Sequence, residues 1–532
     1  MKSQLLDCTL RDGGYVVNKD FDDKVMLGII NGLENSNIDY IEIGFLQDDI
    51  SGGESTVYLN AEMAKKWIPS AKKSIYAVLA DLSRYSAKNL EINDGTSFDA
   101  VRLCFFKHER KDIISFSEEI IKKGYRLFIN PVDTLGYSHM ELLQLIEDVN
   151  KINPDGFSIV DTFGSMYLDD LRTIFNVVNY NLSANIKMGF HSHNNLQMSS
   201  SLAQEFFNLG QNQRDIIVDT TLLGIGRGAG NTPTELTAQY LNAKMKAKYN
   251  MDLILDTIDN YIASIKSTND WGYDVPMFIS GCYSAHVNNI SYLQQKPSLR
   301  FQDLNYILNR IGSEERKRYN YQLLEKAYFD FISSNIDDSE SIKSLAGAFL
   351  NKELLVLAPG KSILEEHEKI NDYINKKNPV IISVNFIPSE IAADYLYFSN
   401  KHRYEFWKHD QNFNNIKKIV TSNIDSEKAE YVISLVGLVK SGWSNLDNSV
   451  ILLLRLLDKL KVKNVALAGF DGYSQNGKNF IAPELERDIK DCHHLNMEIS
   501  QMYLDFIKAA DMKIRIITNS IINDIVQGKA NE

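Results

Sequence analysis

The sequence predicts two α/β domains: a (β/α)₈ barrel over residues 1–250 and a Rossmann-like, doubly wound sheet over residues 345–532. In the first half, short apolar runs alternate with longer helical patterns, and eight such pairs fit into the available length. A second alternation of the same kind begins after residue 345. An open sheet is the competing architecture for the first half, but eight successive units favour closure into a barrel.

The strand candidates of the first half are short apolar runs bounded by turn residues. They are Gln4–Leu10, Tyr40–Phe45, Ser74–Ala80, Ala100–Phe106, Arg126–Asn130, Gly156–Asp161, Lys187–His191 and Ile216–Thr220. Helix candidates lie between them, among them Ser138–Asn150, Met166–Tyr180 and Met198–Leu209. Residues 251–335 are expected to form a mostly helical extension, and the polar run Ser333 to Ser344 is interpreted as a surface linker.

The second half repeats the alternation with a different spacing, which favours an open, mostly parallel sheet. Helices are expected near Ser449–Leu460 and Leu485–Ala510. The strand candidates are Leu354–Ala358, Val380–Val384, Asp394–Phe398, Lys417–Thr421, Tyr431–Val436, Asn464–Ala468 and Lys513–Thr518.

Composition excludes several classes of protein. At 532 residues with 44% hydrophobic and 24% charged residues, the chain has the material for two or three globular domains. The net charge of −12, with no basic block, argues against a nucleic-acid binder. The N-terminus lacks a signal-peptide pattern, and the most apolar run, Val450 to Leu457, is too short to span a bilayer. Four scattered cysteines indicate reduced thiols, so we expect a cytoplasmic protein without a membrane partner.

Polar side chains collect at the predicted C-terminal strand ends, where barrel enzymes place their chemistry. The first strand delivers Asp12, and a later one delivers His191 and His193, which share a face because they are two residues apart. Taken alone, an aspartate beside Arg11 would be a surface ion pair. Together with two imidazoles it predicts a three-ligand metal site with open positions. Glu42, Asp161 and Asn231 also fall at strand ends or just beyond them.

Three separate motifs carry a resemblance to a known superfamily: DCTLRDG at residues 7–13, HSHN at residues 191–194 and GIGRGAGN at residues 224–231. Over roughly residues 1–300 the chain resembles the DRE-TIM metallolyases, which include 4-hydroxy-2-oxovalerate aldolase, hydroxymethylglutaryl-CoA lyase and isopropylmalate synthase. The resemblance implies an enzyme that makes or breaks a carbon–carbon bond through a 2-oxo-acid enolate. It also implies a divalent cation, Mn²⁺ or Mg²⁺, with Zn²⁺ and Co²⁺ as alternatives.

The resemblance assigns roles to individual residues of the metal site. Asp12, His191 and His193 are implied as ligands of the cation, and Asn231 as a further ligand or a close neighbour. Arg11 matches the arginine that stabilises the enolate oxygen, which the chemistry requires because charge develops there. Glu42 either orients Arg11 or forms a structural ion pair in the barrel mouth, and the two interpretations carry equal weight.

Four further residues have two interpretations each. Tyr15 stands where the aldolases carry a histidine base, so it is either the base or a hydrogen-bond donor. Thr162 matches a hydroxyl on the substrate side or is structural. Tyr283 is a substrate-facing aromatic or a packed one. His286 is an ordinary helix histidine or the substitute acid/base.

The loop around Gly226 favours aldol chemistry. The acyl-CoA lyases carry a reactive cysteine in this loop, and the acetyl-CoA-condensing synthases carry a glutamate where this chain has Gly226; both are absent. The leading hypothesis is therefore an aldolase acting on a 2-oxo acid and an aldehyde or sugar. A Claisen-type acyltransferase using acetyl-CoA is one alternative, and a non-catalytic nucleotide-binding protein is another. Barrel relatives commonly pair, so a homodimer is expected by analogy.

In the second half, APGKS at residues 358–362 is not a Walker A motif, because Leu355 stands where that motif needs glycine. A strand, a tight turn and a helix N-terminus remain, which suit a phosphate. The run LAPGKSILEEHEKI at residues 357–370 resembles the opening of bacterial sialyltransferases and related Rossmann-like domains. That likeness implies nucleotide contacts by Gly360, Lys361, Ser362 and Asn385, with a solvated loop as the alternative. A nucleotide or nucleotide-linked sugar would then be the ligand, in surface-polysaccharide biosynthesis.

Overall fold

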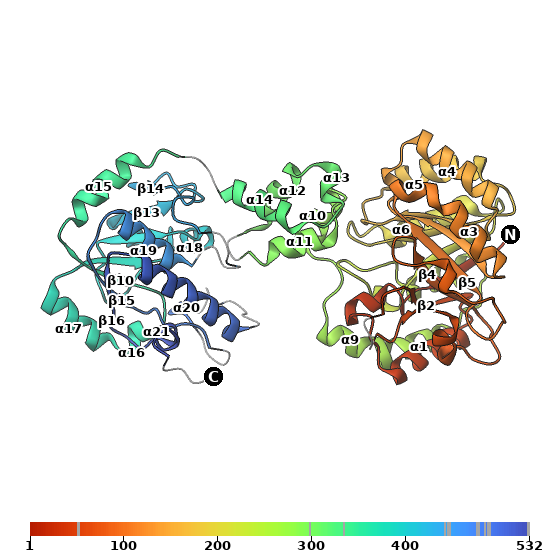
Figure 1. The fold of residues 1–532 in the computed structure, drawn as a ribbon, viewed down its shortest axis with the longest axis horizontal. Coiled ribbons are helices and arrows are strands. Elements are labelled where there is room, and N and C mark those ends of the chain that lie inside the picture. Colours follow the sequence, from red (N-terminus) through yellow and green to blue (C-terminus); the bar gives the residue numbers. More distant parts are fainter. Residues whose placement is uncertain are drawn as a thin grey trace. The chain divides into compact units, whose positions relative to one another are not determined.

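A computed structural model describes the chain except for residues 51–53, 297–298, 333–335, 441–442, 444–447, 475–478, 483–485, 487–490 and 529–532 (Figure 1). The chain divides into two compact units. One comprises Met1–Ser291 and Leu304–Asn320, and the other comprises Tyr292–Asp303 and Tyr321–Glu532. The region predicted as a helical extension therefore contributes residues to both units.

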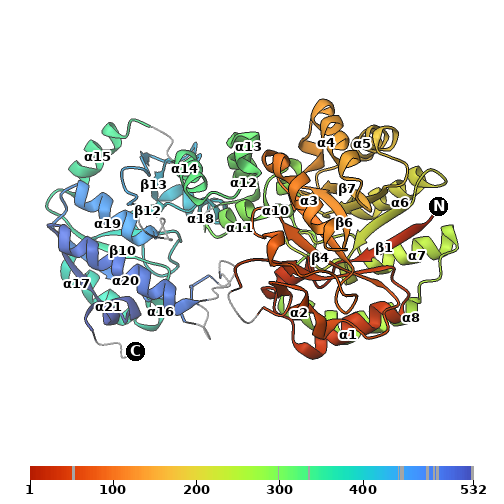
Figure 2. The same cartoon turned by 45° about the vertical axis from the view of Figure 1, so that its right-hand side comes forward.

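The first unit is a closed parallel barrel, as predicted (Figure 2). In the described residues, eight strands follow one another in the order β1, β9, β8, β7, β6, β5, β4, β2, and β2 pairs back with β1 through Leu6–Tyr40 and Asp7–Ile41. A two-residue strand, β3 (Val57–Tyr58), pairs with the C-terminal end of β2 and was too short to predict. The barrel strands are β1 (Ser3–Asp7), β2 (Tyr40–Leu46), β4 (Ile75–Asp81), β5 (Ala100–Phe105), β6 (Arg126–Pro131), β7 (Gly156–Asp161), β8 (Lys187–Ser192) and β9 (Ile216–Thr220).

The first strand is shorter than predicted, and its end shapes the site. The prediction ran to Leu10, but β1 ends at Asp7. The Asp7 side chain accepts a hydrogen bond from the backbone N–H of Thr9 at 2.9 Å, which starts a turn. The backbone N–H groups of Arg11 and Asp12 then both donate to the carbonyl of Cys8, at 3.1 and 2.8 Å. This turn holds Arg11 and Asp12 at the C-terminal end of the barrel.

Helices cover the outside of the barrel strands (Figures 1 and 2). Helix α4 shows why they form: Ser138 and Glu141 make a reciprocal capping box, and Leu142, Leu145 and Val149 recur at helical spacing and are buried. The helices of this unit's continuous segment are α1 (Asp23–Asn35), α2 (Ala61–Ala64), α3 (Ile113–Lys122), α4 (His139–Ile152), α5 (Leu168–Asn181), α6 (Ser199–Gly210), α7 (Thr234–Met245), α8 (Met251–Thr257), α9 (Ala263–Thr268) and α10 (Val275–Cys282).

The segment from residue 287 to residue 349 is largely helical where it is described. It contains α11 (Val287–Gln294), α12 (Phe301–Arg310), α13 (Ser313–Arg316), α14 (Tyr321–Ile332) and α15 (Ser339–Phe349). The prediction of a linker over Ser333 to Ser344 is wrong from Ser339 onward, and residues 333–335 lie outside the described part. Helix α15 extends the polar run to Phe349 and buries Leu345 and Phe349, which lie four residues apart and so on one face of the helix.

The second unit holds a seven-stranded sheet whose described strands are all parallel, in the order β14-β13-β12-β11-β10-β15-β16. The chain leaves β10 toward β11 on one side and returns to β15 on the other. The order therefore reverses between β10 and β15, the position at which open α/β sheets bind ligands. The strands are β10 (Glu353–Leu357), β11 (Val380–Val384), β12 (Tyr395–Phe398), β13 (Lys417–Thr421), β14 (Tyr431–Ile433), β15 (Asn464–Ala468) and β16 (Lys513–Ile516).

Helices accompany this sheet, as the Rossmann-like prediction requires. They are α16 (Ser362–Glu365), α17 (His367–Lys377), α18 (Lys401–Trp407), α19 (Ser449–Lys459), α20 (Cys492–Ala509) and α21 (Ile521–Val526). The helix predicted to begin at Leu485 starts at Cys492 in the described residues, where the Asp491 side chain caps it by accepting the N–H of His494. Among the described residues, no helix combines the length and apolar composition that crossing a bilayer requires.

Candidate metal centre

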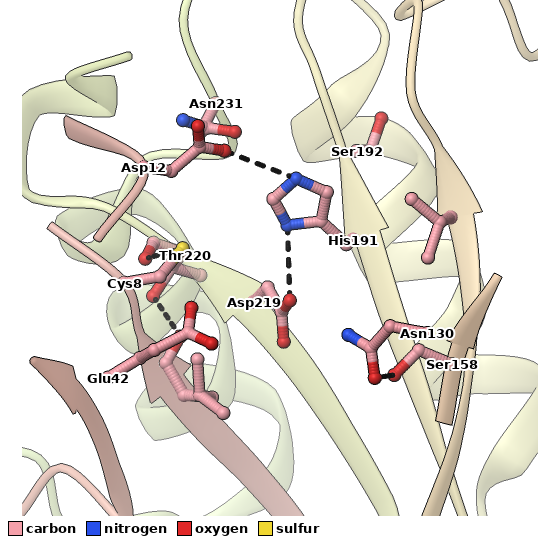
Figure 3. A network of polar contacts seen from close by, with 12 residues as sticks. Cys8, Asp12, Glu42, Asn130, Ser158, His191, Ser192, Asp219, Thr220 and Asn231 are labelled. Carbon is pink, nitrogen blue, oxygen red and sulfur yellow. Dashed lines mark hydrogen bonds and ion pairs between the residues drawn. The ribbon is translucent and has the colours of Figure 1, made fainter. Parts of the chain in front are cut away.

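The barrel brings Asp12, His191 and His193 together at its C-terminal end. Figure 3 shows two of them, Asp12 and His191, with Asn231 next to Asp12. One side-chain atom from each lies within 4.8 Å of the other two. The Nε2 atom of His191 is 3.3 Å from Oδ2 of Asp12, and that of His193 is 3.7 Å from the same oxygen. Asp12 and His191 are 179 positions apart along the chain, yet with His193 they bring one oxygen and two nitrogens close together.

Neighbouring groups orient both imidazoles. Nδ1 of His191 lies 3.1 Å from Oδ2 of Asp219, and Nδ1 of His193 lies 3.3 Å from the carbonyl of Gly230. A partner at Nδ1 fixes the tautomer and leaves the Nε2 lone pair for a cation. Burial lowers the pKa of His193 to about 4, so this imidazole is neutral. Burial alone would raise the pKa of Asp12, but the charge of Arg11 and then of the histidines lowers it well below its usual value.

The residues present fit a divalent cation. Oδ1 of Asn231 is buried and accepts no hydrogen bond from a described residue, and Oδ2 of Asp12 has only ion-pair contacts, with Arg11 and the two histidines. Such atoms are costly unless a partner satisfies them. The Asn231 amide donates to the carbonyl of Ile225 at 3.0 Å, which leaves its oxygen available. Gly226 makes room for it, because a Cβ there would lie 2.2 Å from the Asn231 amide nitrogen. An aspartate oxygen, two imidazoles and an amide oxygen suit Mn²⁺, Zn²⁺ or Co²⁺.

A chain of buried ion pairs links this centre to Arg11. Nε of Arg11 donates to Oε2 of Glu42 at 2.6 Å, and Nη1 of Arg11 lies 3.3 Å from Asp12. Arg102 follows: its Nη1 lies 3.1 Å from Glu42, and its Nη2 lies 2.5 Å from Asp219. Glu42 thus makes the contact to Arg11 that one of its two interpretations required. Since Asp219 also contacts His191, the network runs unbroken from Arg11 to a ligand.

Arg102 and Asp219 were missed by the sequence interpretation, although a signal existed. Each is a charged residue inside an apolar strand candidate, and each is nearly fully buried. Charged side chains are rarely buried in that way unless they are paired. The presence of an arginine and an aspartate in apolar strands of one predicted barrel could therefore have indicated a buried ion pair.

Tyr15 lies beside the centre, next to a second arginine. The guanidinium carbon of Arg227 is 4.0 Å from the centroid of the Tyr15 ring, and the ring packs edge-on against Phe45 at 5.2 Å. Burial raises the pKa of Tyr15, and the opposing charge of Arg227 does not reverse this. The phenol is therefore protonated at neutral pH and is suited to donating a hydrogen bond.

The other predicted residues make contacts of their own. The Thr162 hydroxyl accepts the backbone N–H of Asp133 at 2.8 Å. The Tyr283 hydroxyl donates to Oδ1 of Asn305 at 3.1 Å. Nδ1 of His286 accepts the N–H of Asn288 at 3.1 Å, so a neutral ring carries its proton on Nε2. Burial, and then the charge of Arg227, lower the pKa of His286 to about 4.

In the second unit, a cavity of about 860 Å³ lies at the strand ends where the sheet order reverses. Of the four predicted nucleotide contacts, Gly360 and Asn385 line this cavity, whereas Lys361 and Ser362 are not among its lining residues. Ser362 is engaged elsewhere, since its hydroxyl and its N–H both donate to Asp471. Asn400, Arg403 and Ser449 line the cavity and were not predicted.

Known proteins resemble the barrel. Residues 2–260 match the HMGL-like family model. Oxaloacetate decarboxylase of Mycobacterium tuberculosis is 26% identical over 51% of this chain and 79% of its own length. A 4-hydroxy-2-oxovalerate aldolase of Carboxydothermus hydrogenoformans is 28% identical over 49% of this chain and 77% of its own. The Bacillus subtilis HMG-CoA lyase structure matches with a TM-score of 0.42 and 16% identity, over 50% of this chain and 94% of that one.

Residues 2–260 therefore form an HMGL-like domain, a barrel of the DRE-TIM metallolyase superfamily. Its relatives in sequence are the decarboxylase and the aldolases named above, which are lyases. These matches confirm the predicted superfamily, the enzyme class of metal-dependent carbon–carbon lyase and the divalent cation. The matched family model ends at residue 260, and the sialyltransferase likeness of the second unit stays a prediction.

Proposed function

We propose that the barrel makes or breaks the bond between C3 and C4 of a 2-oxo acid, through the enolate of a pyruvate-like fragment. The observation that carries the proposal is the position of Arg11. Its guanidinium lies 3.3 Å from Asp12, a member of the triad Asp12, His191 and His193. Aldol cleavage of a 4-hydroxy-2-oxo acid and decarboxylation of oxaloacetate both leave an electron pair next to a keto group. The activities named for the two relatives thus both require that the negative charge of an enolate be stabilised.

The residues divide this work between them. Asp12, His191 and His193 would hold the cation, with Asn231 beside them. When bound, the cation supplies Lewis-acid stabilisation of the enolate charge. Arg11 presents a cation to the same charge, and its contact with Glu42 fixes the direction of the guanidinium. Arg102 and Asp219 hold Glu42 and His191 in place.

Hydrogen bonding to the acceptor's oxygen is assigned to neutral donors rather than to a histidine, and the proton that leaves the methyl group when the enolate forms goes to solvent water. Tyr15 lies three residues after Asp12 and is protonated, so it is suited to donating that hydrogen bond. His286 carries its proton on Nε2 and is the second donor near Arg227. Thr162 and Tyr283 have a weaker claim, because protein partners already engage their hydroxyls.

Exchange of pyruvate's methyl protons with deuterated water tests this function. The Mn²⁺-loaded protein should catalyse the exchange, and the Asp12→Asn variant should lose at least a hundredfold of the rate. An absence of exchange in wild-type protein with metal shown to be bound would refute the proposal. Thiol release from acetyl-CoA on addition of a 2-oxo acid would instead favour Claisen chemistry.

For the second unit we propose nucleotide binding, with a nucleotide-linked or phosphorylated sugar as the ligand. The cavity at the reversal of strand order supports this, as does its lining by Arg403 and by the first residues of helix α19. A sugar partner of this kind would belong to surface-polysaccharide biosynthesis. Calorimetric titration of CMP, UDP and GDP into the full chain tests it. Binding lost in Arg403→Met supports the proposal, and no binding of any nucleotide contradicts it.

A further inference from the structure

Arg227 is a charged residue of the barrel mouth that the catalytic roles above leave unused. It lies in the loop after β9 that also carries Asn231. Its guanidinium stacks on the Tyr15 ring at 4.0 Å, a cation–π contact that holds the planar group in one orientation. Its charge acts on His193 and His286 as well as on Tyr15.

Arg227 has no anionic partner among the residues that the structure describes. No carboxylate of a described residue pairs with it, and its Nε–H is buried without an acceptor among these residues. The other arginines of the centre differ, because Arg11 and Arg102 each contact two carboxylates. A buried donor without a partner is costly, and a guanidinium binds carboxylates and phosphates through paired hydrogen bonds. The missing partner is therefore best supplied by a substrate.

We infer that Arg227 binds a second negative charge on the substrate, a carboxylate or phosphate on the acceptor aldehyde, and so makes the enzyme selective for anionic acceptors. This inference rests on the proposed aldol function. The 2-oxo-acid end needs no further cation, because the metal site and Arg11 already serve it. Arg227 stacks on the ring of Tyr15, the residue proposed to donate to the acceptor's oxygen.

Binding of matched ligand pairs tests the inference without turnover. The probes are 2-oxoglutarate, 2-oxoadipate and 2-oxopimelate, each compared by calorimetry with the 2-oxo monoacid of equal chain length, on Mn²⁺-loaded protein. In at least one pair the wild type should bind the diacid tenfold or more tighter. Arg227→Met should reduce that ratio to within threefold of one, with unchanged Mn²⁺ affinity as the control for folding. Lys19→Met should keep the ratio, since the Lys19 ammonium lies 5.9 Å from the centroid of the same ring, farther than the Arg227 guanidinium at 4.0 Å, and donates to Gln47.

The opposite results are equally clear. No preference for any diacid in the wild type, no binding of any pair, or a preference that survives in Arg227→Met would each overturn the inference. Replacing the distal carboxylate by a phosphonate shows which of the two anions is preferred.

Catalysis separates this inference from the proposed function. Arg227→Met should retain pyruvate methyl exchange within threefold of wild type, but its kcat/KM should fall about a hundredfold with succinic semialdehyde or glyceraldehyde 3-phosphate and change little with propanal. An equal loss with all three aldehydes, or a loss of exchange, would contradict selection of the acceptor. If the wild type catalyses no exchange, the proposed function fails, and the binding ratio still decides whether Arg227 recognises an anion.

Discussion

Arg11 shows how much chemistry one turn residue can carry. Its guanidinium is held by Glu42 and lies beside Asp12, so its charge is available where the enolate forms. Replacing it by methionine should lower the rate of pyruvate exchange about 10²–10³-fold, the usual cost of losing one preorganised donor. Mn²⁺ affinity, measured on the same samples, should stay within threefold. A rate near that of the wild type would remove Arg11 from the mechanism.

Asp7, which starts the turn, makes stability depend on pH. Burial raises its pKa to about 6 from 3.8, despite the hydrogen bonds from Thr234 and Thr9. A raised pKa means that the folded protein holds a proton that the unfolded chain has lost. The free energy of unfolding therefore falls as the pH rises from about 4 to about 6. In Asp7→Asn this loss disappears, so relative to wild type the variant should gain about 2–3 kcal/mol over that window in urea unfolding. A difference that is flat with pH would show that Asp7 does not titrate there.

At this scale the sequence predicts the ligands but not their supports. His191 and His193 were predictable because a two-residue spacing on a strand fixes a common face. Arg102 and Asp219 stand out as charged residues in apolar strands, but their contacts with Glu42 and His191 were not predictable, because these depend on which strands meet across the closed barrel. The partner of Ser362 is Asp471, which follows another strand more than a hundred residues later, so its engagement could not be anticipated either.

The ion-pair network ties barrel elements together as well as orienting ligands. Arg102 on β5 joins Glu42 on β2 to Asp219 on β9. Arg102→Met leaves Asp219 buried without its guanidinium and Glu42 with Arg11 alone, so the barrel should lose about 3–5 kcal/mol of stability. Scanning calorimetry should show a clearly lower unfolding temperature. Arg172→Met, which breaks two ion pairs at the surface, is the control and should leave that temperature unchanged. Equal effects of the two substitutions would contradict a structural role for the network.

The loops that follow β10 and β15, where the strand order reverses, pass so close to each other that each carries a glycine at the contact, Gly360 and Gly469. A Cβ on Gly360 would lie 2.4 Å from the carbonyl oxygen of Gly469. Gly360→Ala should therefore separate the ends of β10 and β15 and speed amide hydrogen exchange in both strands, as measured by mass spectrometry. Gly347→Ala is the control, because a Cβ there meets nothing within 4 Å and a helical alanine is favoured. Unchanged exchange in Gly360→Ala would show that the crossing is loose.

For the whole molecule, the sequence predicted both architectures because each half keeps its own strand and helix rhythm. Barrel closure was inferred from the number of units and is confirmed by the β1–β2 pairing. The division into units was harder to anticipate, since Tyr292–Asp303 and Leu304–Asn320 are neighbours in sequence but belong to different units. Which helix joins which unit depends on packing between distant segments, and a local pattern does not contain that information.

The central claim is that Asp12, His191 and His193 form one cation site. Equilibrium dialysis of Mn²⁺ against wild type, Asp12→Ala and His191→Ala tests it most directly, with Asp161→Ala as a control because that strand-end carboxylate is not in the triad. We expect one tightly bound Mn²⁺ per wild-type chain, a loss of affinity of at least a hundredfold in the two triad variants, and near-normal binding in the control. Equal Mn²⁺ affinity in all four proteins would contradict the account.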